Sequence, residues 1–307
     1  MSLEDKVVIT CALSGVLANR KQCAGIPYTP VEIAEEALRA WNAGASVVHI
    51  HARNDDGSPT FSPAVFAAIK DEIRKRCPVI LNFSTGTMID DVSEQSTYVR
   101  ESRPEIAALN MGSMNYSKYS EKRKEFVFDL IFPNPYTKII KLLEAMNAAG
   151  VKPELECFDT GFTAGTAPLI DMGVLKPPFQ FSFIVGVLGG IPPLVESLQL
   201  QTKLMPAGSQ WEVIGISHCH WRMIASALVL GGNIRTGLED HLYLPNKQMA
   251  RNNGEMTEVA ARLTRDVGRE PATVEEARVI LGLDQFSAGR DAATDAARLH
   301  LAPQAEA

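Results

Sequence analysis

The sequence lacks the features that mark disulfide-linked proteins, thiolate metal sites and membrane proteins. Its five cysteines are odd in number and scattered, with no CxxC pair, which argues against a disulfide framework and a zinc site built from thiolates. No apolar run reaches the roughly 18 residues that span a bilayer, and the N-terminus has no charged stretch followed by an apolar one. We therefore expect a cytoplasmic chain with reduced thiols and no membrane partner.

The sequence is also short of positive charge and of phosphate-binding glycine motifs. The formal net charge is -6 at pH 7, and the Lys and Arg residues are spread along the chain rather than gathered in a basic stripe. Neither GxGxxG nor GxxxxGKS/T occurs. These absences argue against a nucleic-acid partner and against a doubly wound dinucleotide-binding sheet.

What is present is a regular alternation of short apolar runs and longer stretches of helical period. With 307 residues, 46% of them hydrophobic, the chain is long enough to bury a large core. Repeated strand and helix signals of this kind are typical of parallel βαβ units. We expect eight strands, at 6–13, 46–52, 79–84, 106–112, 153–159, 179–186, 211–216 and 233–238.

Helix signals lie between the strands. The clearest is a capping box in which Thr29 caps, Pro30 takes the first helical position and Glu32 reaches back. Gly44 then ends this helix, and further helices are expected over 136–149 and 221–230. Eight such units over about 250 residues predict an α/β fold of the (β/α)8 TIM-barrel class.

Two segments fall outside the repeat. Residues 113–135 are long for a loop and polar at 118–124, so we interpret them as an excursion over the mouth of the barrel. Beyond Leu283 the sequence turns rich in Ala, Asp and Arg, with little to build a core. We therefore expect a catalytic barrel domain over 1–284 and a C-terminal helical extension or arm over 285–307.

The second predicted strand carries the most informative motif, His49-Ile50-His51. Alternation along a strand points both histidines to one face. Two imidazoles on one face are part of a metal shell, although a pair of satisfied polar histidines at a strand end has the same pattern. A third ligand has to come from elsewhere in the chain.

Polar residues gather where the other strands are expected to end. Active sites of (β/α)8 barrels lie at the carboxyl ends of their strands. Ser84 and Thr87 follow the third predicted strand, Asn110 lies late in the fourth and Glu156 lies on the fifth. A barrel with a purely structural role has no need of so many polar side chains there.

The eighth predicted strand supplies the third ligand. Strict alternation puts Arg235, Gly237 and Glu239 on one face, with Asp240 next in the chain. Two histidines and one glutamate leave the fourth position of a tetrahedral zinc ion open, which suits polarisation of a carbonyl group. Iron or manganese fits the same ligands, and a simple inward ion pair between Arg235 and Glu239 is the structural alternative.

Several long motifs, in order, resemble those of the β-keto acid cleavage enzymes, whose founding activity is 3-keto-5-aminohexanoate cleavage. The resemblance covers most of the chain. It rests on HIHAR at 49–53, LNMGSMN at 109–115, KPELECFD at 152–159, GGI at 189–191 and RTGLED at 235–240.

The resemblance implies a divalent metal, normally zinc, held by His49, His51 and Glu239. It also implies acetyl-CoA as a co-substrate: a β-keto acid and acetyl-CoA exchange to give acetoacetate and a new acyl-CoA by Claisen and retro-Claisen steps. Members of the family are often tetramers, so a homo-oligomer is expected here.

The resemblance further implies roles for the polar cluster. Asp240 matches the general base for the α-proton, with Arg235 and Ser84 assisting and orienting it. Glu156 is expected to support this cluster, and an inward structural role is its alternative. The pantetheine arm is expected to pass over 189–192, although such a glycine and proline segment is also a common turn.

The expected substrate contacts include one departure from the family. Members that cleave the amino substrate carry a glutamate, shortly after the first strand, that pairs with the ammonium group, and Leu17 stands at that place here. Leu17 therefore joins Thr87, Asn110 and Glu156 as an expected substrate contact, for a tail without positive charge. Arg20 and Lys21 in the same loop equally suit an anionic tail or the phosphates of CoA.

A second departure is Ser217-His218-Cys219-His220, where the family is expected to show Gly-Arg-His-Gln. These histidines form a second His-x-His pair. One interpretation is a polar loop with one of the two lining the substrate pocket, and the other is metal ligation.

Three functions remain open at this point. The first is the acyl-transferring β-keto acid cleavage enzyme, and the second is a barrel hydrolase that uses a metal-bound hydroxide. Such hydrolases usually carry their His-x-His pair on the first strand. The third is a barrel without catalysis, which leaves Arg235, Glu239 and Asp240 without a purpose.

Overall fold

A computed structural model describes residues 2–286 of the chain. The C-terminal extension expected over 285–307 therefore lies outside the described residues from position 287 onward. All five cysteines are free and buried, in agreement with the absence of CxxC spacing.

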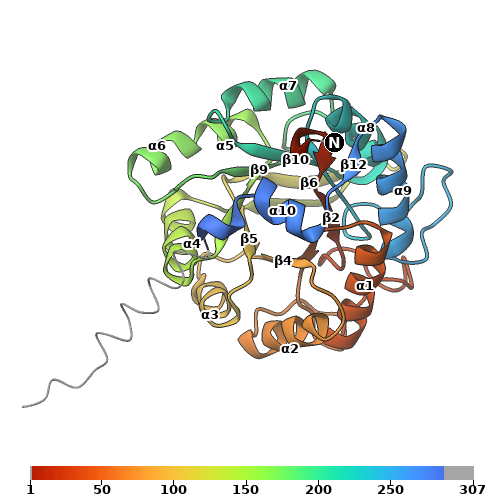
Figure 1. The fold of residues 1–307 in the computed structure, drawn as a ribbon, viewed down its shortest axis with the longest axis horizontal. Helices are drawn as coiled ribbons and strands as arrows, with labels where there is room; N and C mark the ends of the chain where they lie inside the picture. The colour runs from red at the N-terminus through yellow and green to blue at the C-terminus, as the bar shows by residue number, and fades with distance from the viewer. Residues whose placement is uncertain (1, 287–307) are drawn as a thin grey trace, which may run out of the picture.

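Eight parallel strands close into a barrel (Figure 1), which confirms the predicted fold class. Their order around the barrel is β10-β11-β2-β3-β4-β5-β8-β9. Each of the eight predicted strands corresponds to one of them. Their bounds are β2 (Ile9–Ala12), β3 (Val47–Ile50), β4 (Ile80–Ser84), β5 (Ile106–Asn110), β8 (Lys152–Cys157), β9 (Gln180–Val185), β10 (Gln210–Gly215) and β11 (Asn233–Thr236).

Helices surround the barrel as a ring in Figure 1. Their bounds are α1 (Pro30–Ala43), α2 (Pro63–Arg74), α3 (Ser93–Ser102), α4 (Tyr136–Ala149), α5 (Thr160–Ala164), α6 (Thr166–Asp171), α7 (Val195–Leu204), α8 (His220–Val229), α9 (Asn253–Asp266) and α10 (Val274–Ile280). Two 3-10 turns, η1 (Leu3–Asp5) and η2 (Ser217–Cys219), add to these.

The local signals act as the sequence predicts. The Thr29 side chain accepts from the backbone N–H of Glu32, whose carboxylate accepts from the backbone N–H of Thr29. Gly44 (φ 114°) and Gly150 (φ 63°) end α1 and α4 in the left-handed conformation that glycine adopts without a Cβ clash. Caps and turns therefore set where the helices begin and end.

The amino-terminal end of the barrel is closed by the last described helix. Strand β1 (Lys6–Val7) pairs in parallel with β12 (Glu270–Pro271), and α10 crosses the end of the barrel that faces the viewer in Figure 1. A buried apolar cluster joins the starts of the strands to this C-terminal segment. It consists of Val8, Val47, Ile80, Ile106, Ala272, Val274, Ala277, Leu281 and Leu283.

The excursion over 113–135 is an antiparallel hairpin, which the sequence analysis did not predict. Strand β6 (Met114–Ser120) pairs with β7 (Glu125–Phe132), with a shift of register between Lys118 and Tyr119. The polar stretch from 118 to 124 forms the end and turn of this hairpin. No helix within residues 2–286 is long and apolar enough to cross a membrane.

Lys152 provides a test of this closed end. Its side chain is fully buried, its Nζ donates to the carbonyl of Leu281, and burial lowers its pKa to about 7. In the unfolded chain the lysine pKa is roughly 10.4. Between these values only the unfolded chain holds the proton, so this group makes the free energy of unfolding rise with pH.

We therefore expect Lys152→Met to flatten the rise in stability from pH 7.5 to 10, because methionine keeps the apolar stem and does not titrate. Urea unfolding at a series of pH values measures this. The exposed Lys203, replaced in the same way, is the control and should leave the slope unchanged. An equal slope in wild type and Lys152→Met would contradict a neutral lysine in the folded state.

Candidate active site

A cavity of about 280 Å³ opens at the carboxyl ends of the barrel strands. Nine of the sequence-predicted site residues line it, and His49 lies fully buried at its floor in contact with two of them. The structure thus brings together residues from β3, β4, β5, β8 and the segment after β11. Those that line the cavity are Leu17, His51, Ser84, Thr87, Asn110, Glu156, Arg235, Glu239 and Asp240.

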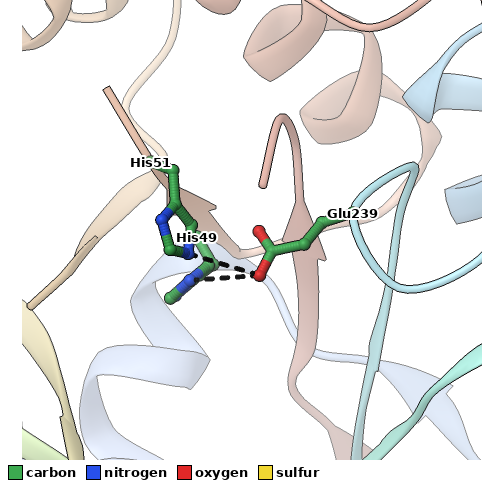
Figure 2. A group of neighbouring side chains, drawn as sticks. All are labelled: His49, His51 and Glu239. Atoms are coloured by element: carbon green, nitrogen blue, oxygen red, sulfur yellow. Dashed lines mark ion pairs between the residues drawn. The ribbon is translucent and has the colours of Figure 1, made fainter. Parts of the chain in front are cut away.

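Three potential metal ligands converge at the floor of this cavity (Figure 2). The Oε1 atom of Glu239 lies 3.7 Å from Nε2 of His49 and 3.4 Å from Nε2 of His51. The two imidazole rings meet edge to face, with centroids 5.2 Å apart. One atom from each residue lies within 4.8 Å of the others, a spacing that a single ion can bridge.

The polar atoms of this trio fit a cation. Among the described residues neither ring nitrogen of His49 has a hydrogen-bond partner, and neither does the buried Oε2 of Glu239. Buried polar atoms are rarely left without partners. Burial, helped by nearby Arg235, holds the pKa of His49 well below its usual range, so the imidazole is neutral and has lone pairs to offer a metal.

Glu239 is ionised despite its surroundings. Burial by itself raises the pKa of its carboxyl, but Arg235 and the two histidines reverse this and hold the pKa well below the usual value. The trio therefore offers imidazole nitrogens from two histidines and one carboxylate, a donor set that divalent transition metals accept.

Glu239 reaches this position by a turn and not by strand alternation. Strand β11 ends at Thr236, and Gly237 has φ 134°. A Cβ at Gly237 would lie 2.2 Å from the carbonyl oxygen of Ala12, so only glycine lets the chain pass this close to β2. Glu239 does lie beside the two histidines, but the predicted continuous strand was wrong, since β11 ends at Thr236.

Arg235 is the centre of the polar cluster. Its guanidinium binds Asp240 through two hydrogen bonds of 3.0 and 2.9 Å and Glu239 through one of 2.6 Å, and it lies 3.6 Å from Glu156. Burial raises the pKa of Asp240 to about 6, against the opposing effect of Arg235. Asp240 is therefore mostly ionised at neutral pH and still basic enough to accept a proton.

Glu156 has the opposite character. Burial and the neighbouring Glu154 raise its pKa to about 8, so it is mostly protonated at neutral pH and can donate a hydrogen bond. Glu154 and Glu156 also form a second possible metal group with His49. This group suits a cation less well, because Glu154 already accepts from Asn82 and Ser182.

The remaining predicted contacts lie around the rim. A Cβ placed on Gly86 would lie 3.6 Å from Oγ of Ser84 and 3.3 Å from Nδ2 of Asn110, so both side chains face this bare backbone. The backbone carbonyl of Thr87 accepts from the buried ammonium group of Lys138, at 2.9 Å. These loops are thus held in place by the barrel beneath them.

The second His-x-His pair does not contribute to the cavity, so the prediction that one of the two lines the substrate pocket was wrong. His218 is exposed on η2. His220 is fully buried beside β10, with Nδ1 2.7 Å from the carbonyl of Gly215 and Nε2 2.9 Å from Oγ1 of Thr236. In the described part of the chain neither belongs to a metal-spaced group. His220 is a satisfied core residue that links β10 to β11.

The opposite wall of the cavity is apolar, and the sequence analysis missed it. Tyr116, Phe128, Leu130 and Phe132 of the hairpin line it together with residues on β9 and β10 and just after β8 and β10. The apolar and aromatic run at 126–132, interrupted by Asp129, was a signal for this strand. The segment 189–192 packs against the hairpin instead: a Cβ on Gly189 would lie 1.8 Å from the carbonyl oxygen of Asn115.

Arg53 holds the loop that bears Leu17. Its guanidinium donates to four backbone carbonyls, those of Ser14, Gly15, Ala18 and Gly57, at 2.7 to 3.0 Å. Gly15 in turn packs so closely on Glu239 that a Cβ there would lie 2.6 Å from its Cγ. Arg53 therefore orders both the rim of the cavity and the backbone behind one potential ligand.

A closed parallel barrel with buried carboxyl groups and a potential metal trio at its carboxyl-end mouth is typical of the (β/α)8-barrel enzymes. Within that class, the sequence identifies the family. The model of the β-keto acid cleavage enzyme family matches residues 6–283, so the chain belongs to this family.

Characterised relatives are similar over nearly their full length. The 3-keto-5-aminohexanoate cleavage enzyme of Fusobacterium nucleatum is 35% identical over 91% of this chain and 98% of its own. The 3,5-dioxohexanoate:acetyl-CoA acetone transferase of Paraburkholderia graminis is 32% identical, with 92% and 97% covered. The 3-oxoadipate:acetyl-CoA acetyltransferase of Cupriavidus necator is 30% identical, with 90% and 94% covered.

The fold is also similar to a solved structure, that of apo ObcA. The TM-score is 0.73 at 19% sequence identity, and the match covers 84% of this chain. This chain spans 65% of the length of that one. At this identity the likeness concerns the fold alone.

The contacts of Arg53 generate a prediction. Lysine keeps the charge but cannot reproduce a planar fork of donors, so Arg53→Lys should lower the free energy of unfolding by about 2 kcal/mol. It should also speed amide hydrogen exchange in residues 14–18. Arg20→Lys is the matched control: Arg20 pairs with Glu32 at a partly exposed position, so its loss should cost less than about 1 kcal/mol. Unchanged exchange in Arg53→Lys would refute the ordering role.

Proposed function

We propose that this chain exchanges a β-keto acid with acetyl-CoA to give acetoacetate and a new acyl-CoA, breaking one carbon–carbon bond and forming another. The observation that carries the proposal is the Arg235 cluster, which holds a basic carboxylate, Asp240, beside the potential metal trio. Membership of the family and the printed names of the relatives support it.

His49, His51 and Glu239 would hold the metal, and we propose zinc. Their imidazole nitrogens and single carboxylate fit it, and the buried atoms of His49 and Glu239 that have no hydrogen-bond partner suit a bound cation. When bound, the metal supplies Lewis-acid polarisation of the keto oxygen, which makes the neighbouring α-carbon more acidic.

Asp240 then takes a proton from the carbon between the keto and carboxylate groups. The carbanion attacks the thioester carbon of acetyl-CoA and expels the CoA thiolate, which attacks the original keto carbon. Cleavage of the bond between that carbon and the α-carbon releases acyl-CoA and the carbanion of acetoacetate, which takes back the proton that Asp240 removed. The role of Asp240 is thus proton transfer at the α-carbon. Arg235 donates a hydrogen bond to each of its two oxygens and so keeps the carboxylate in position.

The other cavity residues would position the substrate. Arg235 keeps Asp240 in place, and the Ser84 hydroxyl can donate to a substrate oxygen or to the base. Asn110 and the protonated Glu156 can donate to the substrate carboxylate, and Thr87 and Leu17 line the entrance. The homo-oligomer and the cytoplasmic location stay predictions.

The barrel hydrolase is the weaker candidate. The three relatives named above are cleavage or transfer enzymes, and two of those names include acetyl-CoA. A barrel without catalysis leaves the buried charge cluster unexplained, because buried ionised groups are costly to maintain.

Metal binding is tested with His49→Ala. Loss of one ligand from the trio should weaken zinc affinity by more than about 100-fold, beyond the 10–100-fold typical of changes around a ligand shell. Zinc content after dialysis and competition with a chromogenic chelator measure this. His218→Ala is the matched control, because His218 is exposed and lies outside the trio. Full zinc occupancy in His49→Ala would reject these ligands.

Catalysis is tested by acetoacetate formation from β-keto acids, with and without acetyl-CoA. Turnover should require acetyl-CoA, and Asp240→Asn should lower kcat by about 10²–10⁴-fold while zinc content is retained. Asp171→Asn on the exposed face of α6 is the control and should keep full activity. Near-normal turnover in Asp240→Asn would reject its role as base, and hydrolysis that ignores acetyl-CoA would favour the hydrolase.

A further inference from the structure

The apolar half of the cavity points to the kind of tail that the substrate carries. Resting on the proposed function, we propose that the preferred substrate is a β-keto acid with a short uncharged apolar tail, such as an unbranched alkyl chain. The relatives named above act on amino, oxo and carboxylate tails by their printed names, so this selects a different substrate class within the family.

The polar and apolar parts of the cavity are separated. The side of the cavity that faces the hairpin is formed by a buried apolar cluster, which includes Phe132, Phe158, Ile184 and Ile214. Nearer the opening lie Leu17 and Leu130, which also line the cavity. A substrate whose keto acid head meets Asp240 therefore has aliphatic and aromatic side chains available for its tail.

The cavity offers no partner for a charged tail. Among its described lining residues Arg235 is the sole arginine or lysine, and three carboxylates already surround its guanidinium. The acidic lining residues are those same three, Glu156, Glu239 and Asp240, all at the head-group end. A charge placed against the apolar wall would lose its hydration without compensation.

The sequence analysis named Arg20 as a possible partner for an anionic tail, but its side chain does not line the cavity. Its guanidinium pairs with Glu32, donates to the carbonyl of Ile26 and lies 4.1 Å from the ring centroid of Tyr28. Neither Arg20 nor Lys21 lines the cavity. The structure thus separates the loop's positive charge from the site that Leu17 enters.

The size of the cavity limits the length of the tail. Its volume of about 280 Å³ must hold the keto acid head as well. This lies just under the range of roughly 300–1,000 Å³ typical of ligand pockets. Each methylene that the apolar wall covers should raise kcat/KM about fourfold until the space is filled, the factor that follows from the transfer free energy of one buried CH₂.

The test uses three six-carbon β-keto acids that differ in the tail: 3-oxohexanoate, 3-keto-5-aminohexanoate and 3-oxoadipate. With the zinc-loaded protein and acetyl-CoA, kcat/KM for 3-oxohexanoate should exceed the other two by at least about 10-fold. The corresponding 3-hydroxy acids, measured as ligands by calorimetry, should bind in the same order without turnover. A preference for either charged tail in both measurements overturns the inference.

Leu17→Glu provides a gain-of-function arm. Leu17 is 65% exposed, so the change should leave the fold intact. It should raise kcat/KM for the amino substrate by about twofold to fivefold and lower that for 3-oxohexanoate, because a carboxylate at the exposed entrance can pair with an ammonium. Leu17→Gln introduces a side chain of the same size as glutamate without the charge, so it should lower kcat/KM for 3-oxohexanoate and leave kcat/KM for the amino substrate unchanged. A gain for the amino substrate in Leu17→Gln as large as in Leu17→Glu contradicts the charge argument.

The two proposals fail in different ways. If none of the three acids gives acetoacetate, the proposed function is rejected, and preferential binding of 3-hydroxyhexanoate would still support an apolar site. If acetoacetate forms fastest from a charged acid, the proposed function stands and the apolar tail is rejected.

Discussion

The buried guanidinium of Arg235 is the interaction on which the site depends. A buried arginine is tolerable only with opposite charge around it, and here Glu239 and Asp240 provide that charge, with the mostly protonated Glu156 3.6 Å away. In return, Arg235 keeps Glu239 ionised and holds both oxygens of Asp240. One side chain therefore sets the charge of a potential metal ligand and the position of a potential base.

The barrel makes this cluster possible by bringing β11 and β3 to either side of β2. The loop after β2 must then have no side chain where Glu239 crosses it to reach the histidines. Gly15 and Gly237 provide the close approach on the two chains, against Glu239 and Ala12. The proposed chemistry thus rests on two positions where no side chain fits.

Much of the fold and of the polar site could be predicted from the sequence. Alternation, capping residues and glycine stops identified the strands and several helix ends, because these signals act over a few residues. His49, His51 and Glu239 were found by assuming that strand ends meet at one mouth. The hairpin, its apolar wall and the burial of His220 were missed, since they depend on contacts between segments far apart in sequence.

The closure of the barrel at its amino-terminal end has a consequence for how the chain is made. Lys6 and Val7 pair with Glu270 and Pro271, and β2 pairs with β11. A nascent chain leaves the ribosome from its N-terminus, so β2 has no neighbour on one side until β11, at 233–236, has been synthesised. That edge of β2 stays open while the strands from β3 to β10 are made, and the ring of eight strands can close only after β11 emerges.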